Sequence, residues 1–129
     1  MKTVVILGAS DKPERYSNKA LLLLKEKGYD VVPVNPTLET IEGIPVVHAL
    51  SDVARHPDVL TVYVNPERSA ALADDILALS PRVAIFNPDT ENDALESRLA
   101  EAGIRIVRAC SVVLLTTDAF EPTVTQKTV

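Results

Sequence analysis

Residues 4–28 decide the fold and read Val4-Val5-Ile6-Leu7-Gly8-Ala9-Ser10-Asp11-Lys12-Pro13-Glu14-Arg15-Tyr16-Ser17-Asn18-Lys19-Ala20-Leu21-Leu22-Leu23-Leu24-Lys25-Glu26-Lys27-Gly28. The unbroken apolar run from Val4 to Leu7 is typical of a strand covered on both faces, as in a parallel sheet with helices on each side. A polar loop follows, and the apolar residues 20–24 predict a helix that ends at Gly28. The apolar segment 30–34 predicts a second strand, parallel to the first.

The polar loop at residues 8–17 is the predicted ligand site. In a strand-helix-strand unit this loop lies at the carboxyl edge of the sheet, where helix amides and the helix dipole favour an anion. Lys12, Arg15 and Lys19 add positive charge in or beside it. We expect the helix to start at Ser17 or Asn18, because both residues are good N-caps.

This loop lacks the usual dinucleotide fingerprint, which has three glycines and an acidic residue about 20 residues further on. Here Gly8 stands alone, Ala9 and Ser10 follow it, and the second strand ends in Asn35-Pro36 without a carboxylate. The longer, basic loop therefore favours a nucleotide whose phosphates are more spread out than the diphosphate of NAD.

The loop and the end of the second strand resemble a known family, the small stand-alone coenzyme A-binding domains. These are similar to the nucleotide-binding domain that opens the alpha subunit of succinyl-CoA synthetases. The resemblance covers most of residues 3–115 and is carried by Gly8 to Ser17, by Gly28-Tyr29 with Val32-Pro33-Val34-Asn35-Pro36, by Gly43 and by Cys110. It implies a Rossmann-like domain that binds coenzyme A, and it implies no reaction. The alpha subunits carry their phosphorylated histidine in a second domain, which 129 residues are too few to include. We therefore expect a free-standing binding module.

Composition favours one soluble domain. The chain has 129 residues, of which 47% are hydrophobic and 24% charged. A net charge of -5 argues against nucleic acid or an anionic membrane as partner, and 4% aromatic residues without Trp argue against a base-stacking platform. The longest apolar run is too short to span a bilayer, no signal-peptide pattern opens the chain, and a single cysteine precludes an intrachain disulfide. We therefore expect a cytoplasmic protein.

Three further strands are predicted at residues 59–64, 83–86 and 104–107, with helical periodicity over 67–79 and 95–102. With Val46-Val47 as a short third strand, we expect a three-layer, doubly wound Rossmann-like α/β fold, with a mainly parallel sheet of about five strands in the order 3-2-1-4-5. If Val46-Val47 is not a strand, the sheet has one fewer member on that side. Residues 112–115 are ambiguous. We expect a coenzyme A-binding domain over residues 1–120 and a mobile polar tail at 121–129.

Asn-Pro follows three of the predicted strands, as Val34-Asn35-Pro36, Val64-Asn65-Pro66 and Phe86-Asn87-Pro88. Each dipeptide suits the junction between a strand and a helix, because proline pushes the preceding residue into extended geometry and asparagine caps the start of the helix. The same dipeptides are expected at the carboxyl edge beside Gly8, where their amides can bond a ribose, adenine or pantetheine. Both interpretations stay open, and the family resemblance favours ligand contact for Asn35-Pro36.

Lone basic residues on loops are either phosphate ligands or merely solvated, and both interpretations apply to Lys12 and Arg15. Arg68 lies in the first turn of a predicted helix, where the helix dipole disfavours it, which suggests another role. The predicted coenzyme A contacts are Gly8, Ala9, Ser10, Lys12, Arg15, Tyr16, Ser17, Asn35, Pro36, Val64, Asn65, Pro66, Arg68, Asn87 and Pro88.

No catalytic or metal-ligating pattern is found in the sequence. His48 and His56 lack a carboxylate or nucleophile at a telling spacing, and Cys110 fits a packed small residue. Three functions follow: a non-catalytic protein that binds coenzyme A or acyl-coenzyme A, a nicotinamide-dependent oxidoreductase or redox sensor on the same fold, and an interaction module that has lost its ligand. The first is favoured, with a homo-oligomer or an unidentified protein partner left open.

Overall fold

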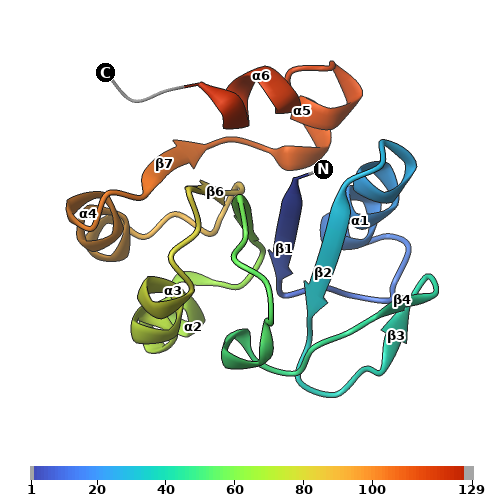
Figure 1. Ribbon diagram of the computed structural model, residues 1–129, viewed down its shortest axis with the longest axis horizontal. Coiled ribbons are helices and arrows are strands. Elements are labelled where there is room, and N and C mark those ends of the chain that lie inside the picture. Colours follow the sequence, from blue (N-terminus) through green and yellow to red (C-terminus); the bar gives the residue numbers. More distant parts are fainter. Residues whose placement is uncertain (1, 127–129) are drawn as a thin grey trace.

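A parallel five-stranded sheet forms the middle layer of the molecule (Figure 1). The structure is a computed structural model and describes residues 2–126. The strands of the sheet lie in the order β2-β1-β5-β6-β7. Their bounds are β1 (Thr3–Leu7), β2 (Asp30–Val34), β5 (Val59–Val62), β6 (Val83–Phe86) and β7 (Arg105–Arg108).

The predicted Rossmann-like parallel sheet is confirmed, and the predicted strand order needs one correction. Val46-Val47 is not a strand of this sheet, because its only pairing in the described chain is an isolated parallel bridge between Val34 and Val47. The bridge lies beside β2, on the side predicted for that segment. The fifth strand of the sheet is β7, which lies at the opposite edge.

Strand β1 is buried on both faces, as its unbroken apolar run predicts. Val5 and Leu7 pack into one core cluster, whereas Val4 and Ile6 pack into the other. Because successive side chains of a strand point to opposite faces, one short run supplies both cores.

Helices cover both faces of the sheet (Figure 1). One core cluster contains side chains of α1 (Tyr16–Glu26), α5 (Ser111–Thr116) and α6 (Phe120–Thr125). The other contains side chains of α3 (Ala73–Leu79), α4 (Asp93–Glu101) and the 3-10 turn η1 (Leu50–Asp52). The connection after β2 also holds a small hairpin of β3 (Thr40–Ile41) and β4 (Ile44–Pro45).

Three segments differ from the sequence-based expectation. The helix predicted over 67–79 is two helices, α2 (Pro66–Ala71) and α3, which meet at Leu72. The ambiguous residues 112–115 belong to helix α5. Instead of a mobile tail, residues 120–125 form α6, in which Phe120 and Val124 are buried. The expected division at residue 120 thus falls inside this helix, and residues 127–129 lie outside the described residues. No helix within residues 2–126 is long and apolar enough to cross a membrane.

Candidate cofactor-binding cleft

Two adjoining pockets open at the carboxyl edge of the sheet and share Gly8 and Tyr63. The loop pocket has a volume of 370 Å³ and is lined by Gly8, Ser10, Lys12, Glu14, Arg15, Tyr16, Ser17 and Tyr63. The strand pocket has a volume of 390 Å³ and is lined by Leu7, Gly8, Ala9, Val34, Asn35, Pro36, His48, Ala49, Leu50, Tyr63, Val64, Asn65, Arg68, Leu72 and Asp75. Together they form one cleft from the start of α1 to the ends of β2 and β5.

Gly8 lies where the chain leaves β1 and passes close to the end of β5. Its φ angle is +90°, and a Cβ atom added there would lie 3.0 Å from Val64 Cγ1 and 3.1 Å from the Tyr63 carbonyl carbon. A side chain at position 8 would therefore meet both backbone strain and a steric overlap. The close approach brings the loop pocket and the strand pocket together.

Two asparagines hold the loop in place. The Asn18 side-chain amide donates to the Ser10 carbonyl at 2.9 Å, and the Asn35 amide donates to the Ala9 carbonyl at 2.9 Å. The Ala9 amide in turn donates to the carbonyl of Val34 at 3.0 Å. The loop is thus attached both to α1 and to the end of β2, which makes its shape part of the fold.

Helix α1 begins without a side-chain cap. It starts at Tyr16 with Arg15 at the N-cap, one or two residues before the predicted start at Ser17 or Asn18, and no side chain accepts a hydrogen bond there. Within residues 2–126, the Tyr16 and Ser17 amides have no acceptor either. Free amides at a helix start carry a partial positive charge, so this end of α1 favours an anion.

The cationic side chains of the cleft are unpaired. Among the described residues, Lys12, Arg15 and Arg68 form no ion pair. Lys12 and Arg15 outnumber the single carboxylate of the loop pocket, that of Glu14, whereas the strand pocket is lined by Arg68 and one carboxylate, that of Asp75. Positive charge is therefore concentrated beside the start of α1.

Tyr63 is a cleft residue that the sequence analysis missed. It lines both pockets, whereas its hydroxyl is buried near the hydroxyls of Thr61 and Ser111 and makes no hydrogen bond of standard length to a described residue. Burial raises the pKa of Tyr63 to about 12, so the phenol is a neutral donor at physiological pH. Its place directly before Val64-Asn65-Pro66, at the end of β5, is the signal that could have identified it. His48, Leu50, Leu72 and Asp75 also line the strand pocket and were not predicted to do so.

The three Asn-Pro dipeptides have different surroundings. Asn35 and Pro36 line the strand pocket, but the Asn35 side chain is already bonded to Ala9, Thr37 and Leu38. Asn65 lines the same pocket, and its oxygen caps α2 by accepting from the Arg68 amide at 2.8 Å. Its side-chain nitrogen makes no hydrogen bond within the described chain.

Asn87 has a structural role, because its side chain is buried and connects neighbouring elements. It is 2% exposed, its nitrogen donates to Thr61 Oγ1 and the Val62 carbonyl at 2.8 Å each, and its oxygen accepts from the Ser111 amide at 2.8 Å. Asn87, Pro66 and Pro88 line neither pocket of the cleft. The other twelve predicted contacts do line it: Gly8, Ala9, Ser10, Lys12, Arg15, Tyr16, Ser17, Asn35, Pro36, Val64, Asn65 and Arg68.

Within residues 2–126, no group of three or more His, Cys, Asp and Glu side chains is placed to hold a metal ion. Cys110 is half-buried at the N-cap of α5, and its thiol makes no capping hydrogen bond. It is not among the residues that line the cleft.

A parallel sheet with helices on both faces, together with a cleft at the carboxyl edge, defines a domain of the Rossmann-like class. A family model described as "CoA binding domain" matches residues 2–116, and the chain belongs to this family.

One curated protein and two solved structures illustrate what this chain is similar to. The uncharacterized protein YneT of Bacillus subtilis is 26% identical over 106 residues, which cover 82% of this chain and 78% of YneT. The crystal structure of an uncharacterized protein is 36% identical with a TM-score of 0.87, covering 93% of this chain and 98% of that one. A structure of acetyl-coenzyme A synthetase 1 of Candidatus Korarchaeum cryptofilum, in complex with phosphate and ADP, shares the fold with a TM-score of 0.70 and 24% identity. That match covers 81% of this chain but 25% of the synthetase chain.

Proposed function

We propose that this protein binds coenzyme A, free or acylated, without catalysing a reaction on it. The phosphates lie in the loop pocket, against the start of α1, with Lys12 and Arg15 as their ligands. The uncapped start of α1 is the observation that carries this proposal, because its free amides and the unpaired basic side chains are complementary to phosphate oxygens.

The rest of the cleft suits the remainder of the cofactor. The strand pocket combines apolar walls, from Leu50, Val64 and Leu72, with the cationic side chain of Arg68. Tyr63 lines both pockets at their junction, and its hydroxyl is buried beside the hydroxyls of Thr61 and Ser111. When bound, coenzyme A supplies a thiol that carries acyl groups.

The nicotinamide alternative is not favoured. A dinucleotide site of the usual kind uses a carboxylate at the end of the second strand for the ribose hydroxyls. Here Asn35 occupies that place, and its side chain is bonded to Ala9 and Leu38. A cytoplasmic location and the absence of nucleic-acid and membrane partners stay predictions from the sequence.

Titration calorimetry of the full chain with coenzyme A, acetyl-coenzyme A, NADH and NADPH tests the proposal. We expect saturable heat with one or both coenzyme A forms and none with the two nicotinamide nucleotides. Heat with NADH or NADPH alone would support the oxidoreductase alternative, and no heat with any of the four would support an interaction module without a ligand.

The Arg15→Ala variant tests the position of the phosphates. Its affinity for coenzyme A should fall by about 1.5–3 kcal/mol, the value for a hydrogen bond to a charged group. Arg98→Ala is a matched control, because Arg98 is an exposed arginine that pairs with Asp74 away from the cleft. An Arg15→Ala variant with unchanged affinity would remove Arg15 from the site.

A further inference from the structure

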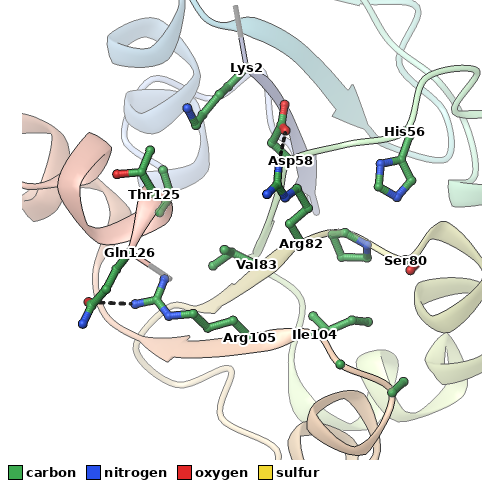
Figure 2. Close-up of a pocket in the computed structure, with 14 residues that line it drawn as sticks. Lys2, His56, Asp58, Ser80, Arg82, Val83, Ile104, Arg105, Thr125 and Gln126 are labelled. Atoms are coloured by element: carbon green, nitrogen blue, oxygen red, sulfur yellow. Dashed lines mark hydrogen bonds and ion pairs between the residues drawn. The ribbon is translucent and has the colours of Figure 1, made fainter. Parts of the chain in front are cut away.

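A third pocket lies at the opposite, amino edge of the sheet (Figure 2). We call it the amino-edge pocket. It has a volume of 650 Å³, which is within the usual size of small-molecule sites. Its lining comes from the residues that start β5, β6 and β7 and from the end of α6, including Asp58, Arg82, Arg105 and Gln126. None of its lining residues lines the cleft at the carboxyl edge.

Basic side chains dominate the amino-edge pocket. Lys2, Arg82 and Arg105 line it with one carboxylate, that of Asp58, in a protein whose net charge is -5. Lys2 is already paired with Glu121 at 2.9 Å. The positive charge available to a ligand is therefore that of the two arginines.

Arg82 forms one long ion pair, and Arg105 forms none with the described residues. Arg82 Nη1 lies 3.9 Å from Asp58 Oδ1, beyond hydrogen-bond distance, and its side chain is 75% exposed. Asp58 directs its other oxygen to the Thr3 amide at 2.9 Å. Arg105 donates to neutral acceptors, the Thr123 carbonyl and Gln126 Oε1, and makes no ion pair with the described residues. Figure 2 shows Arg82 turned toward Asp58 and Arg105 toward Gln126.

The two guanidinium groups reach one pocket because of the sheet register. Val83 pairs with Arg105 across β6 and β7, so Arg82 and Arg105 leave adjacent strand ends. Val83, Ile104 and Val124 give the same pocket apolar walls. Guanidinium groups beside apolar walls are complementary to an organic molecule with acidic oxygens, because carboxylate and phosphate both match the planar fork of arginine.

We propose that the amino-edge pocket is a second ligand site, which takes a small organic anion bearing carboxylate or phosphate groups. Arg82 and Arg105 are its charged ligands. Since the site lies at the sheet edge opposite the cleft, it binds its ligand independently of coenzyme A.

An NMR titration of the full chain tests this site, with succinate and inorganic phosphate as separate probes. We expect saturable shifts of the amides at residues 82–83 and 103–105, with a dissociation constant of about 10 mM or below. Saturation by succinate alone would show that the natural ligand carries a carboxylate, and saturation by phosphate alone would show that it is a phosphate ester. Saturation by both probes would show that the site selects its ligand by charge. Shifts that fail to saturate with either probe would overturn the proposal.

Two variants and a control make the test specific. Arg82→Gln and Arg105→Gln should each weaken binding of the probe by about tenfold or more, because each substitution removes one guanidinium group that contacts the anion. The exposed Arg82 side chain makes no hydrogen bond in the described chain, so Arg82→Gln keeps the test valid if Arg105→Gln unfolds the protein. Arg98→Gln should leave probe affinity unchanged. Equal binding by Arg82→Gln and wild type, or loss of coenzyme A binding in Arg82→Gln, would contradict a separate site.

Discussion

Replacing Gly8 by alanine tests the close approach on which the cleft depends. The new Cβ would lie 3.0 Å from Val64 Cγ1, 3.1 Å from the Tyr63 carbonyl carbon and 3.2 Å from the Val64 amide nitrogen. A positive φ in a non-glycine residue costs about 1–2 kcal/mol, and forcing atoms into a packed site costs a further 1–3 kcal/mol, roughly. We therefore expect Gly8→Ala to lower the free energy of unfolding by about 2–5 kcal/mol.

Gly28→Ala is the matched control. Gly28 has nearly the same φ, +88°, but a Cβ added there meets no atom within 4 Å. This variant should lose only the backbone term, about 1–2 kcal/mol. Urea denaturation of both variants, with the slope m checked for two-state behaviour, measures the difference directly.

Equal losses in the two variants would refute the steric part of this reasoning. The packing of Gly8 against Val64 would then not constrain residue 8, and the strain at positive φ would explain both results. A larger loss in Gly28→Ala would refute the comparison altogether.

Three other substitutions test separate parts of the structure. Lys2 and the Tyr29 hydroxyl hold the pKa of Glu121 below 4.5. The stability that this carboxylate contributes is therefore present above pH 4.5 and is lost as the pH falls through the lowered pKa. In urea denaturation, Glu121→Gln should be about 0.5–1 kcal/mol less stable than wild type at neutral pH. In acid, the two proteins should be equally stable. Asn87→Ala should cost about 1–3 kcal/mol in the same assay, because buried partners stay unpaired, with coenzyme A affinity by calorimetry unchanged. Tyr63→Phe should leave the free energy of unfolding within about 0.5 kcal/mol of wild type and coenzyme A affinity by calorimetry unchanged, because the hydroxyl that it removes is buried beside Thr61 and Ser111.

The layers of the fold follow from local sequence, because a strand buried on both faces needs an unbroken apolar run. Residues 4–7 form such a run, and its side chains supply both cores. The break at Leu72 was not predictable in the same way. Residues 67–79 have a continuous helical pattern, and the backbone at Leu72 departs from it, with φ -99° and ψ 8°. The helix at 120–125 was missed because a Thr-rich composition conceals the burial of Phe120 and Val124.

The candidate cleft was predictable where it follows a strand end, as at Gly8 and Asn35. The same rule failed at Asn87, because that side chain turns inward to Thr61 and Ser111, and no spacing in the sequence reveals such a direction. The amino-edge pocket had no sequence signal, since Arg82 and Arg105 are brought together only by the pairing of β6 with β7.

The missing cap of α1 makes the ligand a structural component in its own right. A phosphate at Tyr16 and Ser17 would supply from outside the acceptor that a serine or aspartate side chain supplies elsewhere. Ligand occupancy of this site and the order of the first helical turn are then linked in both directions. A substitution that loosens the turn weakens ligand binding, and the bound ligand protects the turn from unwinding.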